Sequence, residues 1–420
     1  MNLSIQKRNL RFVYYIVLIV LSFMLMTPGV MLPSILRIVL LILIFSPVVC
    51  NIDEFPFVFV TFYGISSVSF SPILPTSEIY YITIVVVFYL LKNNINENKF
   101  LIGSFLIYSY FLISSLLHLD YNSSLTWFLI AILICDMIRD EQDLMKIFYS
   151  FIIISIFLSV LFFMHRGAFM EQYGANSQDL ERSTWINPNI YGGNIAIGGI
   201  LSIAYLTNFI KITKTKFMTI VCATTFILTF IALILNASRG ALLAFSIPSV
   251  LMLIYSNTKM SYKLLFISIV CIFIVFTYTR TQIFDLLMIR MSEDSVATGG
   301  GRTEIWELKI EKFLLECNIF DLLFGIGETA SANIGRYVST HNDLVTAMIA
   351  YGIIGLLMFL YFIFIYPIVK AKNNKLFVFI LLIYMIIECC VLEPFFRGYI
   401  VFIMFYFFII KFALLGKKIV

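Results

Sequence analysis

The chain has 420 residues, of which 61% are hydrophobic and 16% are aromatic, and its mean hydropathy is +0.99. Soluble domains are about 45–50% apolar, so this composition excludes a soluble globular protein and predicts a polytopic membrane protein. The net charge of +5 is no evidence for a nucleic-acid partner, and none is expected. In a membrane protein the placement of the positive charges is more informative than their sum.

Apolar runs long enough to cross a bilayer recur along the whole chain. A spanning helix needs roughly 20 apolar residues, and this criterion selects about fourteen segments. They are 12–32, 34–50, 55–72, 77–91, 100–117, 123–138, 147–164, 190–209, 216–236, 240–256, 262–279, 343–367, 375–393 and 397–412. Glycine and proline interrupt two short segments, 55–72 and 77–91, which are either spans or re-entrant loops. The predicted fold is an all-α transmembrane helix bundle of about 12–14 spans.

The basic residues set the orientation of these spans, because Lys and Arg concentrate in short cytoplasmic loops. With the N-terminus inside, the inward loops contain lysines such as Lys92, Lys211 and Lys370, and the C-terminal end adds Lys417. Both termini are therefore predicted to be cytoplasmic, and the polar run 279–342 is predicted to face outward.

This topology divides the chain into three parts. Residues 1–278 form a transmembrane bundle with a short outward loop at 165–189, residues 279–342 form one large outward loop, and residues 343–420 return to spans. Segment 281–291 of the large loop reads as a short interfacial helix.

A second helix is predicted in the large loop because apolar residues recur at helical spacing. Trp306, Ile310, Phe313 and Leu314 are expected to share one face, opposite a charged face. Amphipathic helices of this kind lie in the membrane interface, so the loop is expected to form a lid on the outer surface of the bilayer.

Arginine dominates among the outward basic residues, and its planar guanidinium matches phosphate and carboxylate groups. The large loop contributes Arg280, Arg290, Arg302 and Arg336, and a sharp outward turn between two spans contributes Arg239. Any one of them could instead pair with an outward acidic residue. As a set they favour an anionic ligand near the bilayer, since an arginine in so short a turn must snorkel or find an anion.

His341 precedes Asn342 at the outer end of the 343–367 span. Thr340 or Asn342 is expected to cap this helix, with Asp343 in its first turn. His341 is then either an interfacial side chain beside a capped helix or a general base or anion ligand. Histidine suits the second role because its unperturbed pKa is about 6.5.

Glu388 lies inside the apolar segment 375–393. A carboxylate within a span indicates a functional site, although pairing with an outward arginine is the simpler alternative. The sequence contains no HExxH or CxxC pattern, P-loop, dinucleotide fingerprint or GxSxG turn, so no metal and no cofactor are predicted.

In order and placement, these residues resemble the bacterial O-antigen polymerase and ligase superfamily of integral membrane glycosyltransferases. The matching pieces are Asn187-Pro188-Asn189, Ser238-Arg239-Gly240, Gly301-Arg302-x3-Trp306, Gly325-x-Gly327, His341-Asn342 and Ala350-Tyr351-Gly352-Ile353-Ile354-Gly355. The likeness covers roughly residues 185–360, and it rests on the order of the motifs rather than on any one of them.

The resemblance implies an enzyme of the bacterial cytoplasmic membrane that transfers a glycan from undecaprenyl diphosphate to a hydroxyl on the outer face. Arg239 and Arg302 would hold the diphosphate, and His341 would act near the acceptor hydroxyl or the diphosphate. Further candidates for substrate binding are Arg280, Arg290, Arg336, Asn189, Asn342, Trp306 and Glu388. The expected partners are the lipid-linked oligosaccharide, as donor and acceptor, the bilayer, and as a candidate a chain-length regulator protein.

The first expectation is a polymerase of O-antigen or capsule repeat units. A ligase that transfers the glycan to lipid A-core is the close alternative, because it performs the same chemistry on another acceptor. A flippase for lipid-linked oligosaccharides belongs to a different class. It would need a polar path and internal repeats, and the sequence has neither.

Overall fold

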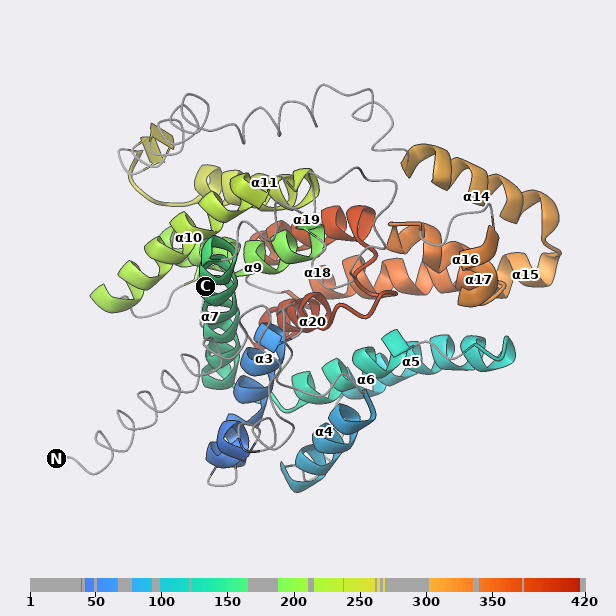
Figure 1. Cartoon of the computed structure of the whole chain (residues 1–420), viewed down its shortest axis with the longest axis horizontal. Coiled ribbons are helices and arrows are strands. Elements are labelled where there is room, and N and C mark those ends of the chain that lie inside the picture. The colour runs from blue at the N-terminus through green and yellow to red at the C-terminus, as the bar shows by residue number, and fades with distance from the viewer. Residues whose placement is uncertain are drawn as a thin grey trace.

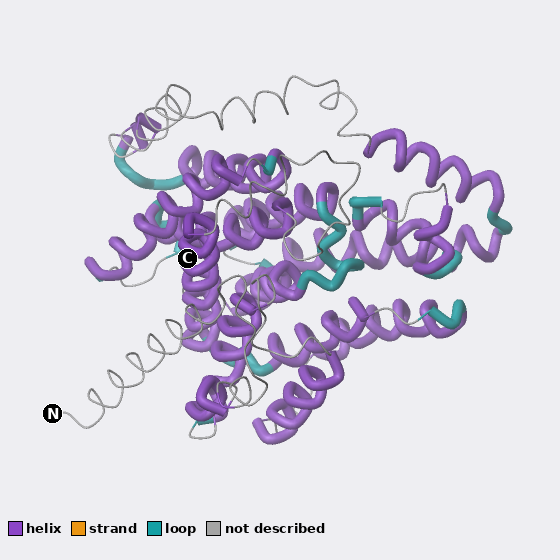
Figure 2. The backbone as a smooth tube through the Cα atoms, viewed as in Figure 1, coloured by secondary structure: helices purple, strands orange, loops and turns teal. Residues whose placement is uncertain are grey.

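The structure, a computed structural model, describes residues 39, 42–48, 51–66, 78–92, 99–120, 123–164, 188–210, 215–236, 238–260, 263–264, 267–268, 302–334, 340–371 and 374–415. Helices form almost all of this backbone, and no strand occurs within these ranges (Figure 2). The prediction of an all-α helical membrane bundle is confirmed.

The described helices follow the predicted apolar segments closely. They are η1 (Ile52–Glu54), α3 (Phe55–Ser66), α4 (Glu78–Lys92), α5 (Lys99–Leu117), α6 (Ser123–Asp136), α7 (Glu141–Met164), α9 (Pro188–Leu206), α10 (Lys216–Asn236), α11 (Arg239–Tyr255), α14 (Arg302–Glu316), α15 (Ile319–Phe324), α16 (Glu328–Asn333), α17 (Asp343–Leu360), η4 (Tyr361–Ile365), α18 (Tyr366–Lys370), α19 (Lys375–Val391) and α20 (Ile400–Leu415). Within the described ranges, four helical stretches are long and apolar enough to cross a membrane: Glu141–Met164, Asn189–Leu206, Lys216–Asn236 and Asp343–Lys370.

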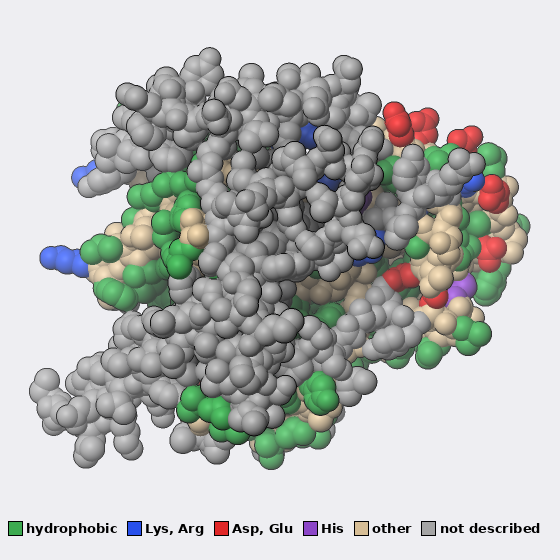
Figure 3. All heavy atoms as spheres, in the orientation of Figure 1, with side chains coloured by type: hydrophobic (Ala, Val, Ile, Leu, Met, Phe, Trp, Pro, Cys, Tyr) green, Lys and Arg blue, Asp and Glu red, His purple; other side chains and the backbone are tan. Residues whose placement is uncertain are grey.

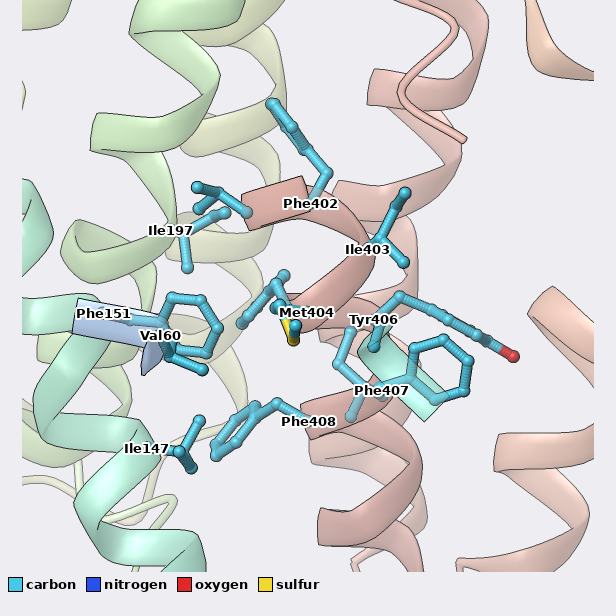
Figure 4. Close-up of a cluster of buried hydrophobic side chains, with 14 of the residues drawn as sticks. Val60, Ile147, Phe151, Ile197, Phe402, Ile403, Met404, Tyr406, Phe407 and Phe408 are labelled. Carbon is cyan, nitrogen blue, oxygen red and sulfur yellow. The ribbon is translucent and has the colours of Figure 1, made fainter. Parts of the chain in front are cut away.

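Helix α20 is the core of the bundle. Every residue from Ile400 to Ala413 is buried, which is the pattern of a helix that is apolar all round and enclosed by protein. Its side chains meet Phe151 of α7, Val60 of α3 and Ile197 of α9 (Figure 4). Helices α3, α6, α7, α9, α18 and α19 contact this apolar rod.

Helix α17 changes direction at Gly352, whose backbone has a φ of 72°. A Cβ atom built on Gly355 would lie 2.4 Å from the Cβ of Tyr351 and 3.6 Å from the carbonyl oxygen of Ala347. In a straight helix residues four apart have Cβ atoms about 5–6 Å apart, and residues eight apart are separated by about 12 Å. The two halves of α17 thus fold sharply against each other, and the segment 343–367, expected as one span, is divided at Gly352.

The freed carbonyl groups at this break are bound by the segment between α15 and α16. The N–H groups of Ile326 and Gly327 donate to the carbonyl oxygens of Ile349 and Ala350, each at 3.1 Å. Backbone this close leaves no room for a side chain at Gly325, where a Cβ would lie 2.2 Å from the Ala350 oxygen. This backbone joint attaches residues 302–334, which we call the cap, to α17.

The cap consists of α14, α15 and α16, which lie beside α17 at one end of the molecule (Figure 1). Phe313 of α14 is fully buried against Val345, and Trp306 and Ile310 pack around it, which agrees with the predicted amphipathic helix. Leu314 was expected on the same apolar face. It is 53% exposed, and it points about 100° away from the buried Phe313, at the edge of that face.

We predict that Gly352→Ala destabilises the protein. Alanine there must adopt a left-handed conformation, and its Cβ would lie 2.3 Å from the carbonyl carbon of Leu323. The expected loss is about 3 kcal/mol, measured as a lower thermal midpoint of the detergent-solubilised protein. Gly103→Ala is the matched control, since a Cβ at Gly103 of α5 meets no atom within 4 Å and alanine favours the helix. Equal thermal midpoints for the two variants would contradict the claim that the backbone joint at Gly352 leaves no room for a side chain.

Candidate active site

Two residues at the start of neighbouring helices shape the turn that carries Arg239. Ser238 precedes α11 and caps it, with its hydroxyl oxygen 3.4 Å from the donating N–H of Ala241. The same hydroxyl donates to the Oδ1 of Asn189 at 2.6 Å. Asn189, a predicted substrate-binding residue, therefore lies at the base of the Arg239 turn and holds it.

Arg239 and Arg302 are brought together although 62 positions separate them in the chain. Arg239 is the first residue of α11 and Arg302 is the first residue of α14. Burial lowers the pKa of Arg302, and the positive charge of Arg239 lowers it further. Two helix N-termini and two guanidinium groups thus concentrate positive charge at one place, which favours a bound anion.

Trp306 links Arg302 to the turn that contains His341. It lies one helical turn after Arg302 on α14, and its indole N–H donates to the carbonyl oxygen of Thr340 at 2.6 Å. Because Thr340 precedes His341 directly, this hydrogen bond brings the histidine turn to the start of α14. Trp306 was predicted to bind substrate. The contact observed for its indole is this hydrogen bond to the protein backbone, and substrate binding stays a prediction.

Asn342, one of the two residues predicted to cap this helix, is the N-cap of the first half of α17. Its side-chain oxygen accepts from the N–H groups of Leu344 and Val345 at 2.9 and 3.3 Å. His341 has a φ of 52°, a left-handed conformation that is uncommon for a residue with a side chain. Asp343 is fully buried, and its carboxylate accepts from backbone N–H groups of the 392–399 segment.

The 392–399 segment contributes two functional candidates that the sequence analysis did not select, Glu393 and Arg397. The Glu393 carboxylate accepts hydrogen bonds from the hydroxyls of Thr340 and Thr346. Its other oxygen forms an ion pair with Nε of Arg397 at 3.2 Å. The sequence feature that could have identified them is a glutamate four residues before an arginine in a short link between two spans.

Glu388 was predicted as a substrate-binding residue, with pairing to an outward arginine as the alternative. Among the described residues, neither carboxylate oxygen of Glu388 has a hydrogen-bond partner, so that pairing is not found there. The residue is fully buried, and a Cβ on Gly193 of α9 would lie 3.1 Å from its Oε1. Glu388 thus packs inside the bundle, and its role in binding stays a prediction.

Several predicted residues lie outside the described ranges. They are Arg280, Arg290, Arg336, Gly301 and the helix expected at 281–291. On the face shown in Figure 3, acidic side chains are visible over α14 and farther down the same side, a histidine is visible beside some of them, and small separate patches of basic side chains are visible near the middle. Over the ranges that the structure describes, no three His, Cys, Asp or Glu residues form a group that could hold a metal ion.

A buried lysine joins two helices of the cap. Lys309 is fully buried, and its ammonium group donates to the carbonyl oxygens of Ser331 and Ala332 at the end of α16. Burial lowers the pKa of Lys309, while the negative charge of Glu393 opposes this shift and Arg397 adds to it. The cap and the 392–399 segment are therefore electrostatically coupled.

Glu328, the first residue of α16, accepts a hydrogen bond from the hydroxyl of Tyr351 at 2.5 Å. The pKa of the Glu328 carboxyl is raised from 4.5 to about 7, chiefly by burial, and the charges of Asp120 and Glu393 contribute to this rise. The Tyr351 hydrogen bond and Arg397 oppose the shift. Glu328 is thus close to half protonated near neutral pH.

We predict that attachment of α16 weakens as the pH rises through about 7. A carboxyl with a raised folded-state pKa holds its proton more tightly in the folded protein, so its contribution is present at low pH and lost on ionisation. The effect of full ionisation is on the order of 3 kcal/mol. Hydrogen–deuterium exchange of residues 325–334, corrected for intrinsic rates, should increase with pH in the wild type. In Glu328→Gln the exchange should not depend on pH, and equal pH dependence in both proteins would refute this account.

The arrangement combines a pair of arginines, a histidine and polar residues from segments far apart in the sequence. Such a set can bind an anionic group and exchange a proton beside it. Residues 224–360, which contain Arg239, Arg302 and His341, match the family model described as O-antigen ligase. A search of curated proteins finds no match to this chain. Over residues 224–360 the chain is thus similar to the superfamily of O-antigen polymerases and ligases.

Proposed function

We propose that the protein is a glycosyltransferase that polymerises oligosaccharide repeat units carried on undecaprenyl diphosphate. The observation that carries this proposal is the meeting of Arg239 and Arg302 beside the His341 turn. A pair of guanidinium groups matches the two phosphates of a diphosphate better than a single cation does. The family match supports the same class of reaction.

In the proposed reaction the acceptor hydroxyl attacks the anomeric carbon of the donor sugar. A new C–O bond forms as the bond between that carbon and the diphosphate oxygen breaks, and the diphosphate leaves with the electron pair. Arg239 and Arg302 stabilise the negative charge that develops on the leaving group. His341 receives the hydroxyl proton as general base. Attack from the opposite face gives inversion at the anomeric carbon.

The proposed location is the outer face of the bacterial cytoplasmic membrane, with both termini in the cytoplasm. The lysine distribution supports this orientation, because the loops assigned to the inside are rich in lysine. The polyprenyl chain of the donor would remain in lipid while its diphosphate reaches the arginine pair. The proposed acceptor is a second lipid-linked repeat unit.

Deletion of the gene tests the proposed class of reaction directly. The deletion strain should carry surface glycan of a single repeat unit, which a gel of the surface polysaccharide resolves. Loss of surface glycan with accumulation of lipid-linked polymer would identify a ligase instead. Unchanged glycan length would refute both activities.

Substitution of the three central residues tests the site. Arg239→Ala, Arg302→Ala and His341→Ala should each lower polymer formation by about 10²-fold or more while still inserting into the membrane, because each removes a group that acts on the reacting atoms. The readout is glycan length in the complemented deletion strain, with immunoblots of the membrane fraction. Lys312→Ala, on the same helix as Arg302, is the charge control and should restore normal glycan. Normal glycan from all three variants would rule out the site.

A further inference from the structure

Two non-glycine residues with left-handed backbone lie in two segments that side-chain hydrogen bonds connect. His341 has a φ of 52° and Glu393 has a φ of 59°. The strain is greater at Glu393, because the following proline restricts the conformation of the residue before it. Strained conformations of this kind persist only where the surroundings fix them, and they cluster at functional sites.

The Glu393 side chain connects the two strained segments. It is 3% exposed and accepts from the hydroxyls of Thr340 and Thr346, which lie on either side of His341 and Asn342. The Thr340 hydroxyl also accepts from the N–H of Asn342 at 3.1 Å. The conformation of the histidine turn is therefore set by one buried carboxylate from a segment some fifty residues later in the chain.

The same carboxylate fixes Arg397. The Nε of Arg397 lies 3.2 Å from Oε2 of Glu393, and the arginine side chain is 40% exposed whereas the glutamate side chain is 4% exposed. The charge of Arg397 is felt by Lys309 on α14 and by Glu328 on α16. Glu393 thus holds a partly exposed cation in a fixed relation to the histidine turn.

A second carboxylate reinforces this connection. The carboxylate of Asp343 accepts from the N–H groups of Phe395 and Phe396, each at 3.2 Å. With Asp343 holding the backbone of the segment, Glu393 is left to orient Thr340 and Arg397. Glu393 and Arg397 lie outside residues 224–360, the part of the chain that matches the family model.

We propose that Glu393 is a positioning residue that holds His341 and Arg397 together as a unit on the acceptor side of the reaction. This inference rests on the proposed function. The arginine pair at Arg239 and Arg302 binds the donor diphosphate without help from Glu393. Displacement of a reacting group by about 1 Å can cost about 10²-fold in rate, so loss of this carboxylate affects the chemical step rather than donor binding.

The test measures kcat and the donor KM of the purified full-length protein in nanodiscs. The donor is the lipid-linked oligosaccharide that accumulates in the deletion strain. Glu393→Gln keeps an oxygen that can accept from the threonines but removes the charge that holds Arg397. We expect kcat to fall by about 10²-fold and the donor KM to change less than about threefold. Arg397→Gln should lower kcat to a similar extent.

The double variant Glu393→Gln/Arg397→Gln should be no slower than the slower single variant, because the two residues act through one contact. The inference would be overturned if the two losses in kcat multiplied in the double variant. It would also be overturned if Glu393→Gln kept kcat within about threefold of the wild type. Glu307→Gln, exposed on α14, is the carboxylate control and should leave both constants unchanged.

A second measurement separates positioning from folding. Farnesyl diphosphate, a short polyprenyl diphosphate, should raise the thermal midpoint of Glu393→Gln and of wild type equally, and should not raise that of Arg302→Ala. A Glu393→Gln protein that fails to fold, or no longer responds to farnesyl diphosphate, would show a structural role and overturn the inference. If the wild-type protein itself does not elongate the lipid-linked oligosaccharide, the proposed function fails, whatever Glu393 does.

Discussion

Two backbone hydrogen bonds hold the active end of this protein together. They run from Ile326 and Gly327 to the carbonyl oxygens exposed where α17 breaks at Gly352. A broken helix is tolerated in a membrane protein only where other groups bind its freed carbonyls. Here the cap supplies those groups, so the break in α17 and the position of the cap stabilise each other. The start of α14, and with it Arg302, is located by this joint.

The second constraint is the charge that this joint brings together. The charge of Arg239 acts on Arg302, and burial lowers the pKa of Arg302 and so increases the cost of keeping it charged. A bound anion would reduce the electrostatic repulsion between the two arginines, so such a pair favours an anionic ligand. The nearby carboxylates of Asp343 and Glu393 accept hydrogen bonds from donors of the protein, so these two acidic groups stabilise the geometry around the arginines.

Periodicity and charge placement predicted most of the helices, because a helix that spans a membrane must be apolar along its whole length. The grouping of Arg239, Arg302 and His341 in one site was predicted from the order of the motifs, and it stays a prediction. The reversal at Gly352 was not, since a glycine inside an apolar run does not reveal whether the helix bends or breaks. Glu393 was missed because its partners, Thr340 and Thr346, come from a distant part of the chain. Hydrogen bonds of that kind are set by tertiary packing, which local patterns do not encode.

The position of α20 has a consequence for biogenesis. This helix follows every other described helix in the chain, yet it forms the centre on which α3, α7 and α9 pack. During synthesis, at about 5–20 residues per second, the earlier helices enter the membrane before their shared partner exists. They can pack against one another at this stage, but the Cys135 thiol, which donates to the Phe407 carbonyl in the finished bundle, is not yet paired with α20. Final assembly of the active end is thus a late, post-insertion event, which exposes the unfinished bundle to membrane quality control.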